Sequence, residues 1–159
     1  MNHYLIDGNN LLGKLSIKDK SYRAENAGSR ELLLIRLTDH FRTKNDSVTL
    51  FLDGHENGKL SGGKIKIIYS NSRTADSLIR EKIEKTKNRK ALKVISSDHE
   101  IQNFARVCSC EIISSEDFAK RLFAKNSNPD DSDIKHDTSV DKDYFIKLFT
   151  SGNDEPQSL

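Results

Sequence analysis

Four aspartates in this chain have the types and positions of a carboxylate site. Asp7, Asp53 and Asp98 each stand at, or shortly after, the end of an apolar run of the kind that forms a buried β-strand. Asp76 falls in the first turn of a predicted helix. Carboxylates that share one crevice repel one another and raise one another's pKa values, which predicts that they bind a divalent cation there. Oxygen ligands favour Mg²⁺ or Mn²⁺, which can bind a phosphodiester and activate a water.

Two of the four acids, Asp7 and Asp76, also have a purely structural interpretation. Asp7 can hydrogen-bond the polar turn that follows it, because Gly and Asn tolerate tight backbone conformations. Asp76 can stabilise its helix through the helix dipole, by a few tenths of a kcal/mol up to about 1. Ser97 and Glu100 have capping-box spacing, which accounts for Glu100 without any chemistry and leaves Asp98 unexplained. The functional interpretation therefore requires that the acids meet in space.

Hydrophobic periodicity predicts the elements that would position these acids. Apolar runs bounded by turn residues predict strands, and apolar residues at helical spacing predict helices between them. The predicted strands cover residues 4–7, 48–53, 65–69, 91–95 and 110–113. The predicted helices cover about 27–43, 72–87, 97–107 and 115–123, with Thr74 as an N-cap of the second, and a turn at 8–10 precedes a polar loop at 14–21.

The alternation of strands and helices predicts an α/β fold. We expect a three-layer, Rossmann-like sandwich around a mostly parallel, five-stranded sheet. Right-handed crossovers place all carboxyl ends of parallel strands on one edge, where ligands bind in open α/β sheets. Asp7, Asp53 and Asp98 should share that edge, with Asp76 beside it.

Charge is distributed unevenly along the 159 residues, which carry a net charge of +2. Residues 126–159 hold eight acids against three lysines, a net charge of −5, whereas the first 125 residues hold 23 basic and 16 acidic residues, a net charge of +7. A basic body suits a polyanionic partner such as RNA.

Four basic residues are predicted to contact substrate phosphates. Lys59 and Lys64 lie in the loop before the third strand, and Arg73 and Arg80 lie at the start of the helix that carries Asp76. Such contacts release counterions and make affinity fall steeply with salt. The alternative is that these side chains are ordinary solvated charges.

Targeting and redox signals are absent from the sequence. No basic and apolar leader precedes the first predicted strand, and no apolar run approaches the length that crosses a bilayer. Cys108 and Cys110 have no further cysteine to complete a zinc site, which predicts reduced thiols. We expect a soluble cytoplasmic protein without a membrane partner.

Four short motifs resemble the YacP-type NYN domains of the PIN-like nuclease superfamily. They contain the four aspartates in the family's order and extend over about residues 3 to 124: Leu5-Ile-Asp7-Gly-Asn-Asn10, Phe51-Leu-Asp53-Gly-His55, Thr74-Ala-Asp76-Ser77 and Ser96-Ser-Asp98. Any one of these motifs is common in unrelated proteins. Four at compatible spacing are fairly specific.

The resemblance implies a divalent-metal-dependent endoribonuclease that hydrolyses phosphodiester bonds of single-stranded mRNA, with the ribosome as a candidate partner. It implies Asp7, Asp76 and Asp98 as the metal-binding acids, Asp53 as a nearby acid, and Asn10 as a turn-fixing or water-orienting residue.

The chain departs from the family pattern at two positions. Arg80 stands one turn after Asp76, where relatives often carry an acid, so that only the displaced Glu81 could replace that acid. Asn9 stands where the usual residue is aromatic. A second hypothesis is an RNA-binding or ribosome-associated adaptor of the same fold that has lost catalysis, against which the retention of Asp7, Asp76 and Asp98 argues. A nucleotide-binding Rossmann enzyme is disfavoured, because no Gly-x-Gly-x-x-Gly turn follows the first strand.

The last 35 residues divide by composition from the nuclease-like domain at residues 1–124. Residues 125–138 read as an acidic linker that is too poor in apolar residues to fold by itself, and residues 150–159 as a disordered tail. Between them, apolar residues at helical spacing predict a helix over 139–149 that docks on the body or on a second copy as a homodimer. The alternative is a tail whose aromatic residues make no steady contact.

Overall fold

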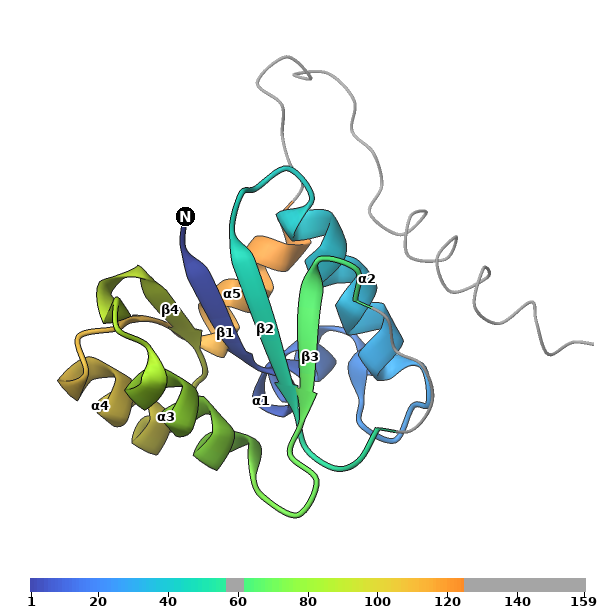
Figure 1. Ribbon diagram of the computed structural model, residues 1–159. Helices are drawn as coiled ribbons and strands as arrows, with labels where there is room; N and C mark the ends of the chain where they lie inside the picture. The colour runs from blue at the N-terminus through green and yellow to red at the C-terminus, as the bar shows by residue number, and fades with distance from the viewer. Residues whose placement is uncertain (57–61, 125–159) are drawn as a thin grey trace, which may run out of the picture. The chain divides into compact units, whose positions relative to one another are not determined.

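Five parallel strands form the central sheet of the computed structural model, which describes residues 1–56 and 62–124 (Figure 1). The strand order is β3-β2-β1-β4-β5, with β1 in the middle. The strands are β1 (His3–Asp7), β2 (Ser47–Leu52), β3 (Ile65–Tyr69), β4 (Leu92–Ile95) and β5 (Glu111–Ile113). The predicted linker 125–138, helix 139–149 and tail 150–159 lie outside the described residues.

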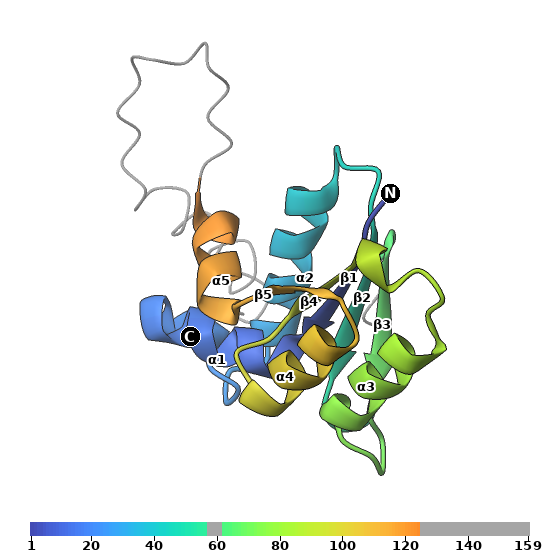
Figure 2. The ribbon, with the colours of Figure 1, turned by 90° about the vertical axis from the view of Figure 1, so that its left-hand side faces the viewer.

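Helices cover both faces of the sheet and complete the three layers (Figure 2). One face carries α1 (Gly8–Lys18), α2 (Ser29–Phe41) and α5 (Ser115–Phe123), and the other carries α3 (Ala75–Lys85) and α4 (His99–Val107). Two 3-10 turns, Lys20–Tyr22 and Arg89–Ala91, complete the described elements. The predicted three-layer α/β sandwich is confirmed, and the sheet is parallel throughout.

Each layer of helices forms its own apolar core against the sheet. Successive strand residues point to opposite faces, so Ile6 packs into the core beneath α1, α2 and α5 while its neighbour Leu5 packs into the core beneath α3 and α4. Both side chains are fully buried. A central strand that is covered on both faces has a continuous apolar run, and this is why β1 can be predicted from the sequence.

Chain order reverses at the boundary between β1 and β4. The chain builds β1, β2 and β3 in one direction, then crosses to the far side of β1 to add β4 and β5. The carboxyl ends of β1 and β4 flank this switch point, which is the preferred ligand position of doubly wound sheets. Asp7 ends β1, and Asp98 follows β4 by three residues.

Helix α1 corrects the prediction of a turn at 8–10 followed by a polar loop. The helix starts directly after β1, and Asp7 is its N-cap residue through a hydrogen bond from the Asn10 amide. Its buried residues Leu11, Leu12 and Leu15 have helical spacing and face the core. The loop prediction was wrong because it took the polar residues after Gly13 as the sign of a loop. Several of these residues lie on the side of α1 that faces away from the core.

Gly8 lets α1 begin so close to the sheet. A Cβ atom at this position would lie 2.6 Å from Leu52 Cδ2 and 2.6 Å from the Phe51 carbonyl oxygen. No side chain fits there without a shift of β2 or α1. The glycine that suggested a break in the strand is therefore a close-packing residue.

The helix caps agree in part with the sequence. Thr74 caps α3 by accepting a hydrogen bond from the Ser77 amide, as predicted. The N-cap residue of α4 is Asp98, whose carboxylate accepts from the Glu100 and Ile101 amides, so the predicted Ser97 cap is wrong.

Among the described residues, no helix combines the length and the apolar character that a bilayer crossing requires.

Candidate active site

Strand register brings the predicted acids to one edge of the sheet, the lower end of the strands in Figure 1. Asp7 pairs with Phe51 of β2, and Ile6 pairs with Ile95 of β4, so both neighbouring strands end level with Asp7. Asp53 and Asp98 follow those strand ends. Helix α3 begins at the same edge, because the Asp53 carboxylate accepts a hydrogen bond from the Ala75 amide at 2.9 Å. We call this group, Asp7, Asp53, Asp76 and Asp98, the acidic edge.

Asp7 is the buried member of the acidic edge, with 5% of its surface exposed. Its Oδ2 accepts a hydrogen bond from the Ser96 hydroxyl at 3.0 Å, and its Oδ1 accepts one from the Asn10 amide at 3.4 Å. Burial raises the pKa of the Asp7 carboxyl to about 6, against these two hydrogen bonds, and the negative charges of Asp76 and Asp53 raise it further. A cation bound beside Asp7 would therefore stabilise its ionised carboxylate.

Ser96 joins Asp7 to Asp98. The Ser96 hydroxyl donates to Asp7 and accepts from the Asp98 amide at 3.1 Å, and the side chain is completely buried. Asp98 has the structural role of capping α4, with distances of 2.8 Å to the Glu100 amide and 3.2 Å to the Ile101 amide. One Asp98 oxygen makes both bonds, so the other has lone pairs for a ligand.

Asp76 is half-buried in the first turn of α3. Burial raises the pKa of its carboxyl, and the negative charges of Asp98 and Asp53 add to this effect. The nearby Arg80 guanidinium lowers the same pKa. Asp98 and Asp53 therefore lie near enough to Asp76 for their charges to act on it.

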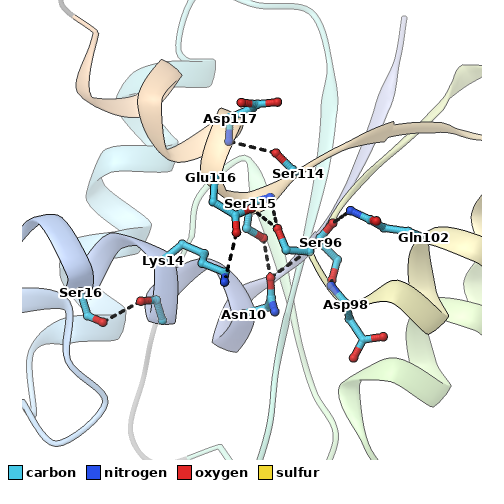
Figure 3. Close-up of polar contacts among 12 residues, drawn as sticks. Asn10, Lys14, Ser16, Ser96, Asp98, Gln102, Ser114, Ser115, Glu116 and Asp117 are labelled. Carbon is cyan, nitrogen blue, oxygen red and sulfur yellow. Dashed lines mark hydrogen bonds and ion pairs between the residues drawn. The ribbon is translucent and has the colours of Figure 1, made fainter.

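Asn10 fixes the turns around the acidic edge (Figure 3). Its Oδ1 accepts hydrogen bonds from the Ser97 amide at 2.9 Å and from the Ser115 hydroxyl at 2.7 Å. It thereby ties the start of α1 to the end of β4 and the start of α5. The Ser97 hydroxyl also bonds Glu116, whose pKa is lowered to about 2 by that bond and by contacts that include Lys14 at 3.1 Å.

Arg80 and Arg73 lie on α3 and at its start, and both pair with acids. Arg80 Nη2 lies 3.1 Å from Glu100 of α4, and its guanidinium lies 5.6 Å from the centre of the Phe104 ring. Arg73 Nη1 lies 2.6 Å from Glu81. Hydrogen bonds from Lys85 and Arg73 lower the pKa of Glu81 to about 2, so Glu81 pairs with these cations.

Lys64 does not reach the acidic edge. It precedes β3 at the amino-terminal end of the sheet, and its ammonium group donates to the Lys44 carbonyl oxygen at 2.6 Å. The expectation that Lys64 flanks the acids was wrong, because a residue just before a parallel strand lies at the amino ends, and the whole length of β3 separates it from the carboxyl ends. Lys59 lies outside the described residues.

Two side chains of this site escaped the sequence analysis as site residues. Ser96 bridges two of the acids, and Asn9 accepts a hydrogen bond from the Asp53 amide at 3.1 Å. Both lie within the motifs that carry the aspartates, which is the only signal that could have pointed to them. Asn9 and Asp53 are 44 residues apart, and Ser96 and Asp7 are 89 residues apart, so local reasoning does not reveal these two pairings.

The donor chemistry of the acidic edge fits a divalent cation. Asp7, Asp76 and Asp98 offer oxygen donors, and burial together with like charge makes the ionised forms of Asp7 and Asp76 costly without a counterion. In residues 1–56 and 62–124, no three His, Cys, Asp or Glu side chains are already grouped to hold one ion. Mg²⁺ commonly keeps several waters and uses one or two carboxylates, so such a closed group is not required.

Comparisons with known proteins agree with this fold. A family model described as the YacP-like NYN domain matches residues 4–151. Two solved structures of Rae1 (YacP) from Bacillus subtilis share the fold. A mutant form has 14% identity and a TM-score of 0.63, and the match covers 98% of this chain and 87% of that chain. The second structure has 17% identity and a TM-score of 0.60, and the match covers 96% of this chain and 83% of that chain. No curated protein matches the chain. The chain belongs to the YacP-like NYN domain family and has its PIN-like nuclease fold.

Proposed function

We propose that this protein is a divalent-metal-dependent endoribonuclease that hydrolyses phosphodiester bonds of single-stranded RNA. One observation carries the proposal: buried Asp7 meets the charges of Asp76 and Asp53 at the switch point of a PIN-like fold, and Ser96 links it to Asp98. In this proposal the protein acts on mRNA in the cytoplasm, with the ribosome as a candidate partner.

Asp7, Asp76 and Asp98 would hold Mg²⁺ or Mn²⁺. Such an ion, when bound, activates a water and neutralises charge on the phosphate. Asp53 supports the site by fixing the start of α3, and Asn10 fixes the start of α1. The chain's own residues thus hold the acids on rigid element ends, which keeps their positions while RNA binds.

Arg73 and Arg80 are the cations that we assign to the RNA backbone. Arg73 lies just before α3 and Arg80 lies one turn after Asp76 on α3, and their side chains are partly exposed. Each must exchange its Glu81 or Glu100 partner for a phosphate, or share it. Lys59 stays a prediction for the same role, whereas the position of Lys64 favours a role away from the acids.

The proposal is tested by incubation of the purified protein with labelled structured and unstructured RNAs in Mn²⁺, Mg²⁺ or EDTA. We expect internal cleavage of the unstructured RNA in either metal and none in EDTA. Asp7→Asn is the control for contaminating nucleases, because it removes the charge and retains the size of the side chain. Equal cleavage by wild type and Asp7→Asn would contradict the proposal.

The second hypothesis is an RNA-binding adaptor without catalysis. Two observations favour it: the described residues contain no preformed three-ligand group, and the basic Arg80 stands one turn after Asp76. The same assay separates the hypotheses. An adaptor would bind the unstructured RNA in a salt-dependent manner and leave it intact in both metals.

A further inference from the structure

A surface cavity of about 330 Å³ lies against α1, beside the acidic edge. Residues from α1 and from the segment after the first 3-10 turn line it, including Asn9, Leu12, Gly13, Arg23 and Glu25. We call it the α1 cavity. None of its lining residues belongs to the acidic edge or to the cations assigned above.

Asn9 connects the α1 cavity to the acidic edge. It stands two residues after Asp7, and its Oδ1 accepts a hydrogen bond from the Asp53 amide at 3.1 Å. Within the described residues, the side-chain nitrogen of Asn9, Nδ2, donates to no protein group, so it can donate a hydrogen bond to a ligand. An RNA strand whose phosphate reaches the acids would therefore pass the mouth of this cavity.

The lining suits a nucleobase better than an ion or a phosphate. Leu12 and Gly13 give an apolar wall, and Asn9, Arg23 and Glu25 provide donors and acceptors around it. A base has an apolar face and a hydrogen-bonding edge, and proteins stack unpaired bases on aromatic side chains or on arginine planes and hydrogen-bond their edges. The volume lies at the lower end of the range for ligand cavities, about 300–1,000 Å³.

Arg23 is suited to such stacking. Its side chain is exposed and makes no ion pair or hydrogen bond with the described part of the chain. This differs from Arg73 and Arg80, which are both paired with glutamates. A guanidinium without a partner can lie flat on a base, and it also offers charge to the neighbouring phosphate.

We infer that the α1 cavity is a nucleoside subsite, which binds one base of the single-stranded RNA whose backbone crosses the acidic edge. The inference rests on the proposed function for the identity of the strand. It adds that substrate binding depends on the face of α1, as well as on the cations of α3.

Gly13 allows the cavity to be filled without disturbing the fold. A Cβ atom at Gly13 would meet no atom within 4 Å, and the residue lies inside α1, where leucine is a better helix former than glycine. Gly13→Leu should therefore fold and occupy the cavity. Gly28→Leu is the matched control, because a Cβ atom there also meets nothing within 4 Å and Gly28 does not line the cavity.

The first measurement is the RNA concentration that half-saturates single-turnover cleavage in Mn²⁺. We expect Gly13→Leu to raise it tenfold or more with the rate at saturation retained, and Gly28→Leu to match wild type. Arg23→Ala is the second cavity variant, with an expected rise of severalfold, and it decides the test if Gly13→Leu does not fold. Equal values for wild type and the folded cavity variants would overturn the subsite and leave the proposed function standing.

The second measurement does not depend on cleavage. The four nucleoside 5′-monophosphates are titrated into the full chain while the amide resonances of Gly13 and Ala24 are followed. Shifts that Gly13→Leu abolishes and Gly28→Leu retains support the subsite, and no shift at millimolar nucleotide overturns it. If wild type cleaves no RNA, the proposed function fails and this titration alone decides the subsite.

Discussion

Asp7 is buried, which disfavours the ionised carboxylate that a metal ligand requires. In the folded protein its pKa is raised from 3.8 to about 6, so between these values the folded state binds more protons than the unfolded state. The free energy of unfolding should therefore fall as the pH rises from about 4 to about 6, when no metal is present. Two pKa units correspond to about 3 kcal/mol.

Asp7→Asn removes this penalty and keeps an oxygen that can accept from the Ser96 hydroxyl or the Asn10 amide. In EDTA at pH 7, we expect the variant to be more stable than wild type by up to about 3 kcal/mol, with the difference vanishing below pH 4. Urea denaturation of both proteins between pH 4 and pH 8 measures it. Parallel stability profiles would show that Asp7 is already solvated.

Glu100 neutralises Arg80 at the acidic edge. Its side chain is 80% exposed, so Glu100→Gln should change the free energy of unfolding by less than about 0.5 kcal/mol. The freed guanidinium should raise RNA affinity severalfold and steepen the salt dependence by about 0.7 in the logarithmic slope. Binding isotherms at several salt concentrations measure both effects.

The control for Glu100→Gln is Glu111→Gln. Glu111 pairs with Lys93 at 3.2 Å, and it begins β5 at the opposite end of the sheet. Its replacement changes net charge by the same amount and should leave the salt slope unchanged. A similar gain in both variants would mean that only net charge matters and that Arg80 has no special place on the RNA path.

At this scale the sequence predicts the acids but not their hydrogen bonds. Asp7 and Asp53 can be predicted as site residues because each follows a continuous apolar run, and the carboxyl ends of parallel strands lie on one edge of the sheet. The hydrogen bonds by which Ser96 joins Asp7 to Asp98 cannot be predicted, since they depend on the register between β1 and β4. Asp98 illustrates the difference: its position was predicted, and its role as the α4 cap was assigned to its neighbour Ser97.

Helix α1 is the element on which the site depends, and its two glycines have opposite roles. Gly8→Ala places a Cβ atom 2.6 Å from β2 and should lower the free energy of unfolding by about 1–3 kcal/mol. Gly13→Ala meets nothing within 4 Å and should raise it by about 0.5–1 kcal/mol, because alanine has the better helix propensity. Urea denaturation in EDTA compares the two variants.

Equal stability of the two alanine variants would contradict the close approach of α1 to β2. The sequence could not supply this contact. Gly8 followed by two asparagines has the composition of a turn, and only the tertiary contact with Leu52 explains the glycine. The other helices were predicted within a few residues at each end, since their apolar periodicity is strong enough to outweigh local turn signals.

Among the described residues, the acids of the site and two of the lysines lie at opposite ends of the strands. The acidic edge lies at the carboxyl ends of the strands, whereas Lys64 and Lys93 lie near the amino ends. The three layers follow from the alternation of elements, which the sequence shows plainly. The parallel sheet also fixes the position of Lys64, because a residue just before a strand lies at the amino ends, and the sequence analysis overlooked this consequence.

The central claim is that the acidic edge cleaves RNA with a bound metal ion. The most direct test is the single-turnover cleavage rate of one labelled single-stranded RNA in saturating Mn²⁺, measured for wild type, Asp76→Asn and Asp98→Asn. Asparagine caps helices as well as aspartate does, so Asp98→Asn preserves α4 and removes only charge. We predict that each variant folds and loses at least about a hundredfold in rate. Cleavage by either variant at the wild-type rate would contradict the assignment of that aspartate, and by both variants the metal-dependent mechanism itself.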